Sequence, residues 1–148
     1  MFKRIVVGTD GSDTASVAVK RAVELAKLSG ATLDVVTAFE PASGPPIATS
    51  ERVEVPGDVQ YEVGARQEVN MILDRAAGEA EAAGVKANAH AREGDPADAI
   101  LDVAEELGAD LIVVGNKGMT GAKRFLLGSV PNKISHHAPS GVYIVRTT

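Results

Sequence analysis

Residues 94–115 read GDPADAILDVAEELGADLIVVG, a helix pattern followed at once by a strand pattern. Asp95 is a typical helix N-cap and Pro96 a typical first helical residue. Gly108 supplies the left-handed residue with which helices often end. The apolar run DLIVV at 110–114 then has the composition of a parallel strand buried on both faces. This helix–strand unit predicts a parallel α/β sheet.

The same alternation runs through the rest of the chain. The predicted elements are, in order, a strand at 4–9, a helix between Ser12 and Gly30, a strand at 32–39, a helix at 59–83, a weak edge strand at 85–92, the unit described above, a helix at 129–137 and a strand at 141–146. Five strands that alternate with four helices require crossovers between parallel strands. We therefore predict one doubly wound, Rossmann-like α/β domain over residues 1–148, with helices on both faces of the sheet.

Residues 40–58 interrupt this pattern. Four of the seven prolines fall there, together with Gly44 and Gly57. Neither flank could bury a core alone, so we interpret the segment as a long loop within one domain. Such a loop is either a functional lid or a surface insertion, and the sequence leaves both open.

Composition restricts the classes of function. The 148 residues, 45% apolar and 24% charged, fit a soluble globular domain. The sequence contains no apolar run of the ~18 residues that a membrane helix needs, and no secretory signal or cysteine is evident. A net charge of -5 argues against binding to nucleic acid or to anionic membranes. We expect a cytoplasmic protein with neither partner.

The stretch GNKGMTGAKRFLLGS at 115–129 departs from this acidic average. Lys117, Lys123 and Arg124 are its charged residues, and it has no acidic residue. Its glycines allow backbone amides to approach a ligand closely, and a helix is expected to begin at its end. Amides of that kind at a helix N-terminus bind phosphate. Two simpler alternatives stay open: a solvated basic loop, and a Ser129 that only caps its helix.

The fold prediction brings this stretch close to a second glycine-containing turn. Ligands of open parallel sheets bind beyond the carboxyl ends of strands, where strand order reverses. The strands at 4–9 and 110–114 are the natural neighbours of that crevice, and GTDGS at 8–12 follows the first of them. Neither G-x-x-x-x-G-K-[ST] nor G-x-G-x-x-G is present.

The spacing Gly115-x2-Gly118-x9-Gly128-Ser129 resembles the signature of the universal stress protein family. IVVGTDGSDTASVAVKRAVELA at 5–26 and REGDPADAILDVAEELGADLIVVG at 92–115 are also similar to that family. The resemblance covers the chain apart from 40–58. It implies an adenine nucleotide alpha hydrolase-like fold with strand order 3-2-1-4-5, often a homodimer, and the ATP-binding branch of the family.

The resemblance also implies site residues at two strand ends. Asp10 is expected to contact the nucleoside, with Gly8 and Thr9 beside it. Ala38 lies where family members read adenine through backbone groups.

Further site residues are implied in the glycine stretch. Gly115 and Gly118 would line the ribose and phosphate path, and Gly128, Ser129 and Val130 would hold the phosphates. Phosphate roles for Lys117, Lys123 and Arg124 are our inference, because the slot of Lys117 varies in the family.

Asn116 is also a candidate ligand contact. Asn116-Lys117 stands where many relatives have serine-histidine, so reactivity attributed to that histidine is absent. His136 and His137 are expected at the surface, because adjacent helical residues point in different directions. We therefore predict no catalytic residue and no metal site within the protein.

Four functions remain open. The first is a regulatory stress-response protein that binds ATP, with Mg²⁺ as a possible companion ion. The others are a cyclic AMP sensor or buffer, a slow ATPase or self-phosphorylating enzyme, and a nucleotide-free dimerisation module. The three basic residues favour ATP. A homodimer through the strand at 141–146 is predicted in each case, because pairing would cover an apolar sheet edge.

Overall fold

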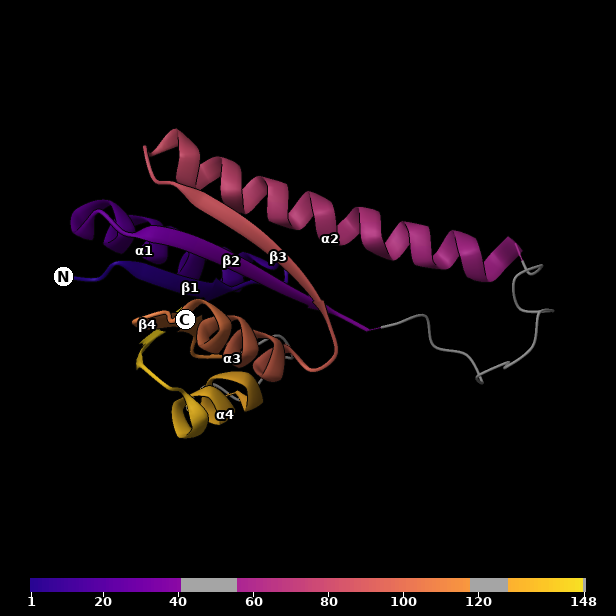
Figure 1. The fold of residues 1–148 in the computed structure, drawn as a ribbon. Coiled ribbons are helices and arrows are strands. Elements are labelled where there is room, and N and C mark those ends of the chain that lie inside the picture. The colour runs from indigo at the N-terminus through magenta and orange to yellow at the C-terminus, as the bar shows by residue number, and fades with distance from the viewer. Residues whose placement is uncertain (41–55, 118–127, 148) are drawn as a thin grey trace.

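The computed structural model describes residues 1–40, 56–117 and 128–147, except for the side chains of 56–65. These residues form one five-stranded parallel sheet with the order β3-β2-β1-β4-β5, as predicted. Its elements are β1 (Arg4–Gly8), α1 (Asp13–Ser29), β2 (Thr32–Phe39), α2 (Pro56–Ala82), β3 (Ala87–Glu93), α3 (Pro96–Leu107), β4 (Leu111–Gly115), α4 (Ser129–His137) and β5 (Gly141–Val145). Helices α1 and α2 cover one face of the sheet, and α3 and α4 cover the other (Figure 1).

The predicted bounds differ most from the structure at the start of α2. This helix begins at Pro56, so the loop prediction is wrong for residues 56–58. Proline fits a first helical turn, because the N–H that it lacks would have no partner within the helix. Residues 41–55, the main part of the predicted loop, lie outside the described residues.

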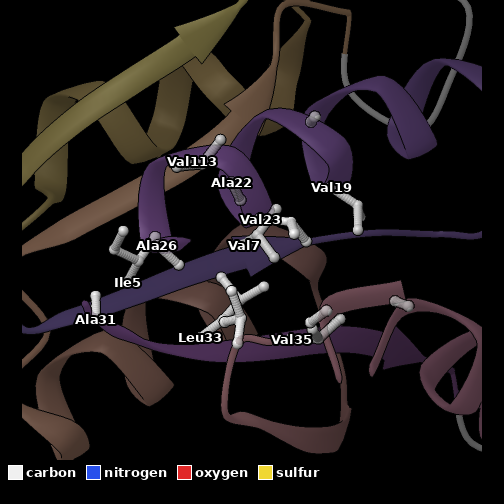
Figure 2. Close-up of a cluster of buried hydrophobic side chains, with 14 of the residues drawn as sticks. Ile5, Val7, Val19, Ala22, Val23, Ala26, Ala31, Leu33, Val35 and Val113 are labelled. Carbon is white, nitrogen blue, oxygen red and sulfur yellow. The ribbon is translucent and has the colours of Figure 1, made fainter. Parts of the chain in front are cut away.

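Two apolar layers enclose the sheet, because successive side chains of a strand point to opposite faces. Ile5 and Val7 of β1 pack toward α1 and α2, whereas Val6 packs toward α3. Figure 2 shows the first layer, in which the small side chains of Ala22 and Ala26 let α1 lie close to the strands. Burial of these side chains from both faces explains why β1 reads as a continuous apolar run.

The predicted ends of α1 and α3 are confirmed. The side chains of Ser12 and Asp95 each accept a hydrogen bond from a backbone N–H of the first turn, at 3.2 and 3.0 Å. Gly30 and Gly108 follow their helices with φ of 71° and 62°. These ends fix where each helix passes its chain to the next strand.

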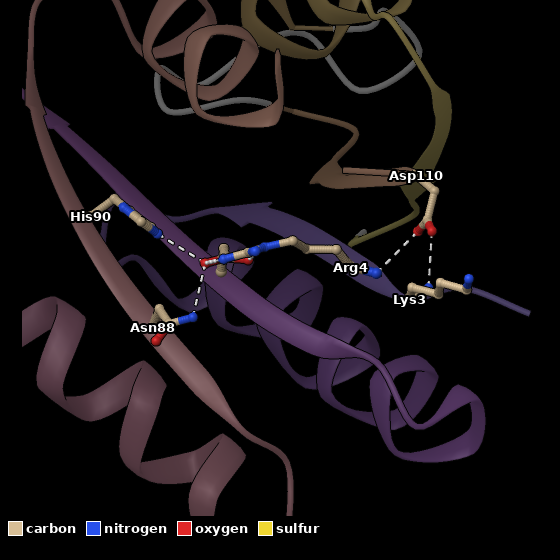
Figure 3. A network of polar contacts seen from close by, with 6 residues as sticks. Lys3, Arg4, Asn88, His90 and Asp110 are labelled. Atoms are coloured by element: carbon tan, nitrogen blue, oxygen red, sulfur yellow. Dashed lines mark hydrogen bonds and ion pairs between the residues drawn. The ribbon is translucent and has the colours of Figure 1, made fainter. Parts of the chain in front are cut away.

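A buried carboxylate, that of Asp34, lies within β2 on the side of the sheet where Val36 packs toward α3. Its partners Arg4, Asn88 and His90 are labelled in Figure 3. Its oxygens accept hydrogen bonds from Arg4 Nε at 2.8 Å and from Asn88 Nδ2 at 3.3 Å, and His90 Nε2 lies 2.9 Å from Oδ1. Burial raises the pKa of Asp34, but the hydrogen bonds from Arg4, His90 and Asn88 outweigh it and hold this pKa below its ordinary value. The carboxylate is therefore satisfied within the protein.

Candidate functional site

A cleft opens at the carboxyl ends of β1 and β4, where the order of strands reverses. It is narrow and partly open to solvent. Its lining includes Gly8, the last residue of β1, and Gly115, the last residue of β4. Lys117, which follows β4, and Val130 of α4 also line it. The fold thus brings together residues that are more than a hundred positions apart in the sequence.

The turn after β1 is held rigidly by Thr9, which is buried. The Thr9 N–H donates to the Val36 carbonyl at 3.0 Å, and the Thr37 hydroxyl donates to the Thr9 carbonyl at 3.0 Å. Thr9 Oγ1 accepts from the N–H of Gly11 at 3.1 Å. With these groups occupied by the protein, Thr9 serves to position the turn.

Asp10 is the residue of this turn that retains a free acceptor. Its Oδ1 accepts a hydrogen bond from the Ser12 N–H at 2.9 Å, which closes the turn. No described residue donates to Oδ2, and the side chain is partly exposed. Asp10 can therefore anchor the turn and offer one oxygen to a hydroxyl group at the same time.

Two glycines near the cleft are explained by packing. A Cβ on Gly8 would collide with the Ile100 side chain of α3. Gly11 has φ +82°, and a Cβ there would lie 2.8 Å from Ile72 of α2. These glycines let helices from both faces approach the turn, a reason that requires knowledge of tertiary neighbours.

Ala38 contributes backbone groups at the end of β2. Backbone groups of a strand alternate in direction, and Val36 bonds toward β1 while Phe39 bonds toward β3. The N–H and C=O of Ala38 therefore point to the side of β1, beyond the point at which β1 has ended at Gly8. Such groups can hydrogen-bond the edge of a planar base.

The N-terminus of α4 lies at the cleft. Gly128 is the N-cap and Ser129, which is exposed, is the first helical residue. The alternative that Ser129 only caps its helix is therefore wrong. The first backbone N–H groups of a helix lack partners within the helix and favour a negative charge. Val130, in this first turn, lines the cleft.

The side chain of Asn116 bonds to Thr147, which follows β5. Its Oδ1 accepts hydrogen bonds from the N–H and the hydroxyl of Thr147, at 2.9 and 2.8 Å. Lys117, the next residue, is partly exposed and lines the cleft. The remaining predicted site residues, Gly118, Lys123 and Arg124, lie outside the described residues.

Comparison with known proteins identifies the family. A model of the universal stress protein family matches residues 1–146. The chain belongs to the universal stress protein family.

Individual members of the family agree with this assignment. The universal stress protein Rv1636 of Mycobacterium tuberculosis is 38% identical over 149 residues, covering 99% of this chain and 98% of the relative. A universal stress protein crystallised in complex with cAMP is 34% identical with a TM-score of 0.73, covering 99% and 98% of the two chains. A third protein, from Archaeoglobus fulgidus in complex with dAMP, is 26% identical with a TM-score of 0.69, covering 97% and 98%.

Histidines and helices elsewhere in this universal stress protein form no further site among the described residues. His136 and His137 are exposed, as predicted, and the described ranges hold no group of three metal-ligating side chains. No helix of these ranges is both long enough and apolar enough to cross a membrane.

Sequence reasoning missed a second cleft and one wall of the first. A mostly apolar cleft with about 690 Å³ of empty space lies between α1 and α2 and borders on Thr9 and Gly11. Thr147 and Ile100 line the first cleft, although neither was predicted as a site residue. Helical periodicity shows which residues face inward, but it does not show where two helices leave a gap.

Proposed function

We propose that this universal stress protein binds an adenine nucleotide at the carboxyl ends of β1 and β4 and acts as a regulatory stress-response protein. The observation that supports the proposal is the shared cleft: Gly8, Gly115, Lys117 and Val130 line one space beside a helix N-terminus. Two similar proteins were solved with cAMP and with dAMP, so the chemistry has precedent within the fold.

Each part of the nucleotide has a partner of matching chemistry. Adenine would bond to the backbone groups of Ala38, and the ribose hydroxyls would donate to Asp10 Oδ2. The phosphates would accept from the first amides of α4, with Lys117 as their counter-charge. Gly118 would extend this path on the basis of the sequence motif, and Lys123 and Arg124 on the basis of their charge.

ATP is the nucleotide that we propose, because a triphosphate would use the whole basic stretch. Mg²⁺, where present, would be held mainly by the phosphates. Cyclic AMP is the second candidate, and the cAMP complex of a 34% identical protein favours it. A cyclic monophosphate needs only the helix N-terminus.

A homodimer through β5 is part of the proposal. This strand lies at the edge of the sheet, and the backbone groups of Val142 and Ile144 point away from β4 because those of Val145 bond toward it. Pairing with a second copy would satisfy these groups. A monomer mass in sedimentation analysis at micromolar concentration would contradict it. We propose the cytoplasm as the location, with which a cysteine-free chain is compatible.

The test is calorimetric titration of the nucleotide-stripped protein with ATP, ADP, AMP and cyclic AMP, with and without Mg²⁺. We expect ATP to bind most tightly, and Lys117→Met to weaken ATP binding about tenfold through loss of one charge-assisted contact. Lys133→Met is the matched control, because Lys133 of α4 instead pairs with Asp98 at 2.8 Å. Tighter binding of cyclic AMP would select the second candidate, and no binding of any nucleotide would refute the proposal.

A further inference from the structure

Asn116 joins three segments of the chain that meet at the cleft. Its backbone N–H donates to the carbonyl of Val145, the last residue of β5, at 2.9 Å. Its carbonyl accepts from the N–H of Gly128, the N-cap of α4, at 3.0 Å. Its side chain accepts both hydrogen bonds from Thr147. One residue therefore ties the end of β4 to β5, to α4 and to the C-terminal tail.

This bonding leaves the amide oxygen of Asn116 no capacity for a ligand. A carbonyl oxygen has two lone pairs, and Thr147 fills both, with its N–H and its hydroxyl. The two backbone groups of Asn116 are also occupied. Through these groups Asn116 sets the position of other groups, while its side-chain NH₂ keeps two donors that bond to no described residue.

Those other groups form the part of the cleft that suits phosphate. The bond to Gly128 sets where α4 begins relative to β4, and hence where its first amides lie. Thr147 itself lines the cleft, and its methyl carbon would lie 3.2 Å from a Cβ added to Gly115. The C-terminal tail is therefore a wall of the proposed nucleotide site.

We propose that Asn116 is a positioning residue, and that the Asn116–Thr147 clamp, the pair of hydrogen bonds from Thr147 to Asn116 Oδ1, holds the phosphate-binding end of the site in shape. The inference rests on the proposed function and deepens it. It assigns Thr147 to the wall of the nucleotide site and gives Asn116 a positioning role in addition to the direct ligand contact that the sequence analysis expected.

The first test compares two substitutions of Thr147 that differ in whether they keep the hydroxyl donor. Thr147→Val removes the hydroxyl donor and keeps the shape, whereas Thr147→Ser keeps the donor. We expect Thr147→Val to weaken AMP and ATP binding about three- to tenfold, the range of one neutral hydrogen bond, and Thr147→Ser to restore most of that loss. Adenosine, which has no phosphate, should bind both variants alike.

A double-mutant cycle separates positioning from contact. Asn116→Ala should weaken AMP binding at least as much as Thr147→Val, and the double variant should be no weaker than Asn116→Ala alone, because both changes break one clamp. Loss with Asn116→Ala but not with Thr147→Val would identify a direct contact and overturn the inference. An equal loss of adenosine affinity would overturn it as well, because it would indicate general loosening.

A measurement without nucleotide tests the Asn116–Thr147 clamp separately from the proposed function. In ligand-free protein, amide hydrogen exchange at Gly128 should be faster in Thr147→Val than in wild type and close to wild type in Thr147→Ser. Unchanged exchange in Thr147→Val would refute the clamp even if nucleotides bind. If wild type binds no nucleotide but Gly128 responds as expected, the proposed function fails and the clamp remains a structural link to α4.

Discussion

Polar groups at the two ends of the sheet differ in whether their hydrogen bonds are made within the protein. Toward the amino ends of β1 and β4, the carboxylate of Asp34 bonds to three side chains, and that of Asp110 accepts from the N–H groups of Lys3 and Arg4 at 2.9 and 3.2 Å (Figure 3). At the carboxyl ends, Lys117 and, in the first turn of α4, Val130 line a cleft, and Asp10 Oδ2 accepts no hydrogen bond from the described residues. Polar groups that are satisfied inside the protein stabilise the fold, whereas those that face outward can recognise a ligand.

The same contrast separates neighbours within one turn. Thr9 is buried and its groups bond to Val36, Thr37 and Gly11. Asp10 follows it and keeps one oxygen free among the described residues. Position near a cleft is thus a weaker guide to ligand contact than the number of hydrogen bonds that a group still lacks.

From this difference between the two ends of the sheet, we predict the largest effect for Asp34→Ala. The substitution should lower stability and leave nucleotide affinity unchanged. Removing the carboxylate leaves Arg4 and His90 without their shared partner, which should lower the free energy of unfolding by about 3 kcal/mol, the lower range for a broken buried ion pair. Arg4 is 35% exposed, so water offsets part of the loss. Urea unfolding at pH 7 measures this effect. A change of more than threefold in the nucleotide affinity of the folded variant would contradict a role for Asp34 in stability alone.

Gly128→Val should mainly lower nucleotide affinity, whereas Asp34→Ala should lower only stability. A branched side chain at the N-cap of α4 would crowd the first amides of the helix, and we expect ATP affinity to fall about a hundredfold, as for loss of a charge-assisted hydrogen bond. Calorimetry measures the affinity, and the melting temperature should fall by only a few degrees. Gly78→Val is the control, because Gly78 of α2 faces open space. If Gly128→Val does not fold, Gly128→Ala replaces it, and full affinity in a folded variant would contradict the proposed phosphate position.

The smallest predicted effect is the dependence of stability on pH. The folded-state pKa of Asp34 is below its ordinary value, so the unfolded chain takes up the proton first as the pH falls. The stabilisation is complete above the unfolded pKa and is lost as the pH falls toward the folded pKa. Urea unfolding between about pH 6 and pH 3 should give a shallower decline for Asp34→Asn than for wild type. Parallel declines would show that Asp34 is not a source of acid sensitivity.

Most of the fold could be predicted from the sequence because the signals are local. The caps at Ser12 and Asp95 and the apolar runs of β1 and β4 depend on residues close in the chain. The start of α2 was predicted wrongly because Pro56 suits both a loop and a first helical turn. Local patterns do not distinguish these two conformations.

The cleft was predicted in outline because parallel topology places the ends of β1 and β4 side by side. Its details depend on contacts between distant residues, which a single sequence does not contain. Asn116 and Thr147 are 31 positions apart, and Arg4 and Asp34 are 30 apart. TLDVVTAF predicts a strand, but nothing in it identifies the partner of its aspartate.

The place of Thr147 in the wall of the cleft has a practical consequence for handling this protein. A bulky label attached at position 147 would lie next to the proposed phosphate position and would compete with or distort nucleotide binding. Met1 is fully exposed and precedes the amino end of β1, at the opposite end of that strand from the cleft. A label for binding studies should therefore be placed near Met1 and not near Thr147.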